Sequence, residues 1–220
     1  MMRPDPWQRW SPLAGVAYVL LFLAALGVSS DGPGDTPEEL TRYFADEGNR
    51  TSEFFAFFLL VAAALALLWF LGALRGVLVR AEREPARWTA LAYGSGVASA
   101  ALLMASASLF LARAGAASQD EFAFDPATAN MFTYAAYALL VCSTMSAAIL
   151  VLATSIVALR TDVLPRWTAL AGFVVAAVLL FAVFFIPIFV WLAWVLAVSI
   201  SLILRTARVT GWRKGPSAAG

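Results

Sequence analysis

The chain has no histidine, a single cysteine and a single lysine among its 220 residues. Without histidine it lacks the commonest metal ligand and the usual general base, which excludes Ser-His-Asp hydrolysis and the zincin motif. The one cysteine, Cys142, cannot form an internal disulfide, and its apolar surroundings predict a small buried side chain. Walker A and Rossmann glycine motifs are absent too. The chain is therefore predicted to be no enzyme and to bind no cofactor or metal.

Charged residues are also scarce, at 13% of the chain against 62% hydrophobic residues, with a mean hydropathy of +0.81. A soluble domain is about 25% charged, so this balance predicts a polytopic membrane protein whose first partner is the lipid bilayer. The net charge of only +1 gives no reason to expect a nucleic-acid partner. The abundance of arginine over lysine, together with much alanine, is typical of bacterial genomes rich in GC.

Apolar segments long enough for a membrane-crossing helix, about 17–25 residues, occur at six places. They are Pro12–Val28, Phe54–Leu74, Thr89–Ala112, Met131–Leu159, Thr168–Ile186 and Ile188–Leu204. The last two form one continuous apolar stretch, in which Pro187 predicts a break; a single long, kinked helix is the alternative. We therefore expect an all-α fold, a transmembrane bundle of six helices.

The charges divide unequally between the two sides of this predicted bundle. One side has twelve basic and four acidic residues, a net charge of +8, whereas the other has three basic and ten acidic residues, a net charge of −7. Because cytoplasmic segments carry the excess of arginine and lysine, both termini are predicted to be cytoplasmic. The predicted location is the cell inner (plasma) membrane. The partition uses every charged residue, so none is expected within the hydrocarbon core.

An arginine followed by a tryptophan introduces three of the apolar segments, at residues 9, 87 and 166. The intervals of 78 and 79 residues favour internal duplication, although basic-aromatic helix starts also arise independently. Arginine suits the headgroup region, tryptophan the aromatic belt, and the Ser or Thr that follows can cap a helix. We expect one domain, residues 1–220, with hairpins at about 9–80, 87–160 and 166–205 and a flexible C-terminal tail at 206–220.

The first outer connection is predicted to contain an amphipathic helix from Thr36 to about Glu47. A capping threonine, a first-turn proline and a capping-box glutamate are combined in the sequence Thr36-Pro37-Glu38-Glu39. One face of this helix would carry the apolar side chains of Leu40, Tyr43 and Phe44. These three residues form a candidate outer lid; packing on the bundle or on the membrane surface, with no role in binding, is the alternative.

Hydroxyl side chains gather on the third and fourth apolar segments. They have two interpretations, close helix packing with hydrogen bonds between helices or a hydroxyl-lined ligand cavity. The candidate cavity residues are Tyr93, Ser99, Tyr137 and Thr144. Small residues on the third segment further predict that it is central in the bundle. These small residues are Gly94, Gly96, Ala98, Ala101 and Ala105.

The chain resembles uncharacterised small multi-pass membrane proteins common in actinobacteria. The resemblance rests on the Arg-Trp-x-x-Leu-Ala-Gly starts, on Pro37-Glu38-Glu39-Leu40 with Tyr43-Phe44, and on Trp69-Phe70-Leu71-Gly72-Ala73-Leu74-Arg75. It implies an inner-membrane location and supplies no substrate or site. The layout of three hairpins is also similar to that of mitochondrial carriers, but their Pro-x-Asp/Glu-x-x-Lys/Arg signature is missing, so their function is not implied.

Two functions follow from these observations. The favoured one is a non-catalytic integral membrane protein that acts by association, as an accessory subunit with a membrane-protein partner or as a homo-oligomer. The alternative is a small-molecule or lipid transporter or binding protein that uses the hydroxyl-lined cavity between the third and fourth apolar segments. A cavity lined by the four candidate residues would favour the second function, and a solid bundle the first.

Overall fold

The computed structural model describes residues 13–28, 36–82, 85–118 and 125–212, with side chains up to residue 205. Regular structure in these residues is helical throughout, which confirms the all-α prediction. The elements are α2 (Leu13–Val28), α3 (Pro37–Ala45), α4 (Glu47–Glu82), α5 (Arg87–Ala117), α6 (Pro126–Thr161), α7 (Arg166–Leu179), the 3-10 turn η1 (Ala182–Phe184) and α8 (Ile186–Trp212). Residues 9 and 10 of the first Arg-Trp start and residues 213–220 of the predicted tail lie outside the described residues. The prediction of a flexible tail is wrong for residues 206–212, which continue α8.

Four helices in the described part of the chain are long and apolar enough to cross a membrane: α4, α5, α6 and the Ile186–Arg205 part of α8. Helices α2 and α7 are equally apolar but have only 16 and 14 residues. At 1.5 Å per residue they are about 24 and 21 Å long, shorter than a hydrocarbon core of about 30 Å. The structure thus agrees with a membrane protein. Among the described helices, four are long enough to cross a membrane, whereas α2 and α7 are shorter than the hydrocarbon core.

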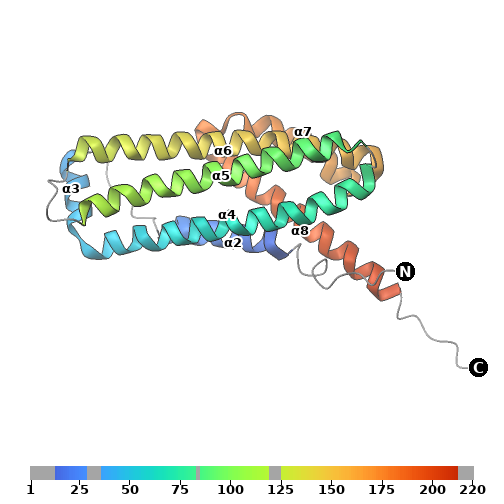
Figure 1. Cartoon of the computed structure of the whole chain (residues 1–220), viewed down its shortest axis with the longest axis horizontal. Helices are drawn as coiled ribbons and strands as arrows, with labels where there is room; N and C mark the ends of the chain where they lie inside the picture. The colour runs from blue at the N-terminus through green and yellow to red at the C-terminus, as the bar shows by residue number, and fades with distance from the viewer. Residues whose placement is uncertain (1–12, 29–35, 83–84, 119–124, 213–220) are drawn as a thin grey trace, which may run out of the picture.

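The long helices α4, α5 and α6 run side by side along the long axis of the molecule, and α3 lies across one end (Figure 1). With 36, 31 and 36 residues, they are about 54, 46 and 54 Å long. Helix α2 packs on α4 and α8, and α7 packs on α6 and α8. Because α2 and α7 are short, the section of the bundle nearest α3 consists of α4, α5 and α6 without them.

The predicted break before α8 is present. The chain reverses direction at η1, and Pro187 lies in the first turn of α8, where a helix needs no N–H from it. The alternative of one long, kinked helix is therefore wrong. Backbone N–H groups through the turn bond to nearby carbonyls, among them Phe184 to Phe181 at 3.1 Å and Ile188 to Phe185 at 3.0 Å. The turn is apolar, and hydrogen bonds within it satisfy these backbone N–H groups.

Helix α6, and not the third apolar segment, occupies the centre of the bundle. It contacts α3, α4, α5, α7, η1 and α8. On α5, Gly96 is buried, and a Cβ at this position would lie 2.5 Å from Leu71 Cδ2 of α4. The other small residues of the predicted central segment face outward instead; these are Gly94, Ala98, Ala101 and Ala105. The prediction of a central α5 is therefore wrong except at Gly96.

The Thr of the second Arg-Trp start does not cap its helix, contrary to expectation. Helix α5 begins at Arg87, which places Thr89 inside the first turn. The carboxylate of Glu82, at the end of α4, caps the helix instead: it accepts hydrogen bonds from the backbone N–H groups of Trp88 at 3.0 Å and Thr89 at 2.8 Å. The Thr89 hydroxyl also donates to it at 2.6 Å. An acidic group is well placed here because the free N–H groups make a helix N-terminus electropositive.

The first and third Arg-Trp starts place a glycine at the same position, and both glycines lie at tight helix contacts. A Cβ added to Gly15 of α2 would collide with the Ser199 hydroxyl of α8. A Cβ added to Gly172 of α7 would collide with the Ser155 hydroxyl of α6. Absence of a side chain therefore allows the close approach typical of membrane helices. The second start has Tyr93 at this position.

Candidate functional site

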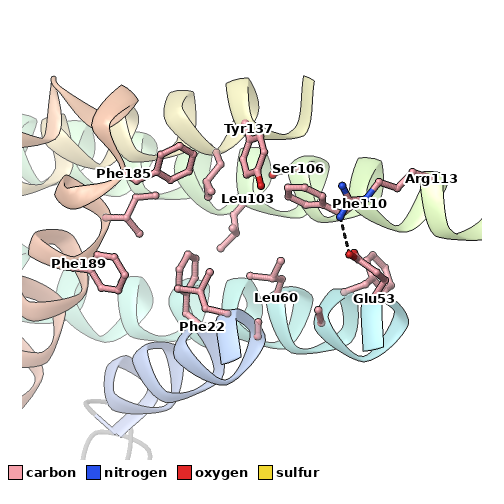
Figure 2. Close-up of a pocket in the computed structure, with 16 residues that line it drawn as sticks. Phe22, Glu53, Leu60, Leu103, Ser106, Phe110, Arg113, Tyr137, Phe185 and Phe189 are labelled. Carbon is pink, nitrogen blue, oxygen red and sulfur yellow. Dashed lines mark hydrogen bonds and ion pairs between the residues drawn. The ribbon is translucent and has the colours of Figure 1, made fainter. Parts of the chain in front are cut away.

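A cavity of about 300 Å³ lies next to the C-terminal end of α2 and next to the turn between α7 and α8. The long helices α4, α5 and α6 form the rest of its wall (Figure 2). This volume is at the lower end of the range of ligand-binding pockets, about 300–1,000 Å³. Most lining side chains are apolar, and they come from α2, α4, α5, α6 and the start of α8. They include Phe22, Leu60, Leu103, Phe110, Phe185 and Phe189. The cavity is thus a product of unequal helix lengths.

An ion pair lies at the end of the cavity that is farthest from Phe185 and Phe189 (Figure 2). Arg113 Nη2 of α5 lies 2.7 Å from Glu53 Oε1 of α4, and the side chains are only 5% and 3% exposed. The ends of the predicted apolar segments place both charges in connecting loops, but Glu53 lies within α4 and Arg113 within α5. The two charges compensate each other where they are buried.

The guanidinium of Arg113 is held by several further contacts. Its Nη1 donates to the Thr133 hydroxyl of α6 at 2.8 Å. The rings of Phe110 and Phe44 lie with their centroids 4.9 and 5.5 Å from its central carbon, within the range of cation–π attraction. The buried Nε has no hydrogen-bond partner among the described residues. Arg113 is therefore fixed in position while one donor is left unpaired.

Helix α3 packs on this charged end of the bundle. It has the predicted capping box, in which Glu39 N donates to Thr36 Oγ1 at 3.2 Å and Thr36 N donates to Glu39 Oε2 at 3.3 Å. Leu40 and Phe44 are buried against α5 and α6. The Tyr43 hydroxyl donates to Glu53 Oε1 at 3.4 Å. The amphipathic helix is confirmed, and two of its candidate lid residues contact the ion pair directly; their action as a lid stays a prediction.

Of the four residues predicted to line a cavity, Tyr137 does so and the other three do not. In Figure 2 the Tyr137 hydroxyl points toward the middle of the cavity, beside Leu103. Its ring makes edge-on contacts with Phe110 and Phe185, each with centroids 5.4 Å apart. Tyr93 lies elsewhere on α5, with the guanidinium of Arg75 5.3 Å from its ring centroid.

The hydroxyls of Ser99 and Thr144 are used in hydrogen bonds within the protein. Ser143 Oγ donates to the Ser99 carbonyl at 2.7 Å, and the two serine hydroxyls are 3.1 Å apart across the α5–α6 contact. Thr144 Oγ1 donates to the Leu140 carbonyl of its own helix at 3.0 Å. Both side chains are buried. Ser99 therefore joins two helices, Thr144 bonds within its own helix, and neither lines the cavity of Figure 2.

Sequence reasoning missed Glu53, Arg113 and the phenylalanine lining. A usable signal was present: Glu53 directly precedes one predicted span and Arg113 directly follows the next, so opposite charges meet at the same end of adjacent helices. The phenylalanines carried no such signal, because an inward-facing phenylalanine has the same sequence context as a lipid-facing one.

Cys142 is exposed on the surface of α6, which corrects the prediction of a buried side chain. No group of three or more Cys, Asp or Glu residues that could hold a metal ion occurs among the residues that the structure describes. In comparisons with known proteins, no family model, no curated protein and no solved structure matches this chain.

Proposed function

We propose that the chain is a non-catalytic protein of the plasma membrane that binds a small lipidic molecule in the cavity beside Glu53 and Arg113. The observation that carries this proposal is an apolar cavity of ligand size with a buried ion pair at one end. A buried ion pair is often no more stabilising than apolar residues of the same volume. Its presence beside a cavity therefore supports a role in binding.

In this proposal the helices enter the membrane as three hairpins with both termini in the cytoplasm. The charge partition supports this orientation. Twelve of the basic residues lie on one side, and the side of a membrane protein that carries the excess of arginine and lysine faces the cytoplasm. Glu53 and Arg113 then lie near the outer boundary, with Phe22, Phe185 and Phe189 deeper. Reporter fusions after residues 83 and 220 should give cytoplasmic signals, and a fusion near residue 34 an external one.

Association with other membrane proteins, the function favoured by the sequence alone, gains no comparable support. Large apolar side chains are exposed along the bundle, such as Phe58, Trp69 and Val174. A surface that faces lipid requires such side chains whether or not it binds a partner. The cavity, in contrast, is a feature that an association role does not need.

The test compares the lipids that remain bound after purification. Leu103→Trp adds bulk to a side chain that lines the cavity, whereas Leu170→Trp makes the same change on an exposed position of α7. We expect a lipidic species to co-purify with the wild-type protein and with Leu170→Trp and to be lost from Leu103→Trp, as measured by mass spectrometry of organic extracts. Identical lipid profiles in all three proteins would refute the proposal. Ala56→Leu, which adds three carbon atoms at another lining position of the same cavity, serves if Leu103→Trp does not fold.

A further inference from the structure

The cavity has one charged end and one aromatic end, and this polarity indicates which lipidic molecules it accepts. We infer that its ligand is an uncharged amphiphile whose head group carries a hydrogen-bond acceptor, such as a fatty alcohol or ester. The head would lie at Arg113 and the tail at Phe22, Phe185 and Phe189. This inference rests on the proposed function and specifies its substrate class.

Charge balance favours an uncharged ligand. Glu53 and Arg113 are within ion-pair distance and almost completely buried, so their charges compensate each other. A carboxylate or ammonium group added beside them would have no counter-ion from the described residues that line the cavity. Burial of such an unpaired charge is strongly unfavourable. The ion pair thereby selects against charged amphiphiles of either sign.

Unused hydrogen-bond donors favour an acceptor in the ligand's head group. A guanidinium has five N–H donors and no acceptor. In the described residues, Nη2 of Arg113 donates to Glu53 and Nη1 to Thr133, and each of these nitrogens carries a second N–H. The Nε is enclosed by protein atoms, so a ligand in the cavity does not reach it. The Tyr137 hydroxyl points into the same cavity (Figure 2) and can donate a further hydrogen bond. A carbonyl or hydroxyl oxygen can accept a hydrogen bond from an Nη of Arg113 or from the Tyr137 hydroxyl, whereas a plain hydrocarbon can accept from neither.

Size and direction favour a single chain of medium length. The cavity volume of about 300 Å³ is at the lower end of the range of ligand pockets. It therefore suits one chain of medium length better than a lipid with two long chains. The ion pair and the phenylalanines lie at opposite ends along α4 and α5 (Figure 2), so the chain would lie along the bundle. Such an arrangement has the head near the membrane boundary and the tail inside the cavity, at the depth of the lipid chains.

The test uses a photoreactive diazirine analogue of 1-decanol with the purified full-length protein in lipid nanodiscs at pH 8. Labelled residues are identified by mass spectrometry, and the competitors are 1-decanol, decanoate, decylammonium and decane. We expect label on residues that line the cavity, such as Leu103 and Tyr137. We expect 1-decanol to displace it at a concentration at least tenfold below that of the charged competitors or of decane.

Two outcomes separate the inference from the proposed function. Equal displacement by decanoate or decane overturns the head-group selectivity while cavity labelling still supports the function. Absence of label from the cavity, or unchanged label in Leu103→Trp, overturns the function itself.

A variant series adds a readout that does not depend on affinity alone. Glu53→Gln leaves the charge of Arg113 uncompensated and should shift the preference from 1-decanol toward decanoate by at least tenfold. The double variant Glu53→Leu/Arg113→Leu keeps an apolar interior and should weaken the preference for 1-decanol over decane, because only the Tyr137 hydroxyl is left to donate to the head group. Unchanged preferences in a folded variant of either kind contradict the role assigned to the pair.

Discussion

The indole Nε1 of Trp191 donates a 2.8 Å hydrogen bond to the hydroxyl of Tyr18, 173 residues earlier in the chain. Both side chains are 2% exposed, and their rings meet edge-on with centroids 6.3 Å apart. This contact joins α2 to α8. It therefore ties the first helix described to the last one, close to Phe22, which lines the cavity one turn further along α2.

Removal of the Tyr18 hydroxyl should destabilise the bundle. Tyr18→Phe leaves the buried indole N–H of Trp191 without an acceptor, a loss of about 1–3 kcal/mol in the free energy of unfolding. Reversible unfolding in mixed detergent micelles measures the change. Tyr134→Phe is the matched control, because Tyr134 is 70% exposed; equal effects of the two substitutions would contradict the assigned hydrogen bond.

Enlargement of Gly96 and of Ala101 should have different effects although both lie on α5. Gly96→Leu forces a side chain into Leu71 and should cost about 1–3 kcal/mol through overpacking. Ala101 is exposed, so Ala101→Leu should leave the midpoint of thermal unfolding unchanged. Similar losses for both variants would show that α5 is enclosed on two sides.

Labelling of single cysteines should follow the faces of α3. The background is Cys142→Ser, which is necessary because Cys142 is exposed. Leu40 and Phe44 are buried and Arg42 and Asp46 are exposed, so maleimide should react slowly at positions 40 and 44 and rapidly at 42 and 46. Rapid reaction at all four positions would contradict docking of α3 on the bundle.

Loss of one charge from the interior ion pair should be worse than loss of both. Arg113→Gln leaves Glu53 buried and unpaired, at a cost of about 3–5 kcal/mol. Replacement of both residues by leucine should cost much less, because no unpaired charge remains. Detergent unfolding of the two single variants and the double variant measures the coupling. An additive result would mean that the two side chains do not act as a pair.

Protonation of Asp125 should weaken the start of α6. The Thr128 hydroxyl, followed by the N–H groups of Ala127 and Thr128, donates to this carboxylate and lowers its pKa below the ordinary value of 3.8. Because the folded-state pKa is lowered, the stabilisation is complete above pH 3.8 and is lost as the pH falls through the folded-state value.

The measurement compares wild-type protein with Asp125→Asn, whose side chain does not titrate. Thermal unfolding should show a stability advantage for the wild type at pH 5–7 that disappears in stronger acid. A constant difference over the whole range would contradict the assignment of this carboxylate as the helix cap.

The helices could be predicted from the sequence because a backbone in lipid must satisfy its own hydrogen bonds. Apolar runs therefore correspond closely to helices, and Pro187 marks the break before α8. The helix ends could not be predicted in the same way. Charges usually mark where a segment leaves the membrane, but Glu53 and Arg113 neutralise each other and let α4 and α5 continue.

The candidate site was harder to predict for a related reason. Tyr137 was selected because of its hydroxyl group, and it does line the cavity. Ser99 and Thr144 carry the same group, but Ser99 is hydrogen-bonded to Ser143 across the α5–α6 contact and Thr144 to a carbonyl of its own helix. Which of these roles a hydroxyl has depends on how far the neighbouring helices extend beside it. That information lies in the three-dimensional arrangement of α2, α7 and α8, and no local pattern in the sequence contains it.

The neutrality of the ion pair has an electrical consequence. Transfer of one elementary charge across a membrane potential of 100 mV involves about 2.3 kcal/mol of work. Glu53 and Arg113 sum to zero and are only 2.7 Å apart, so the field performs almost no net work on them if they move together. A ligand without charge adds none. Occupancy of the cavity would then be the same in an energised cell and in a depolarised one, and the concentration of the ligand alone would set it.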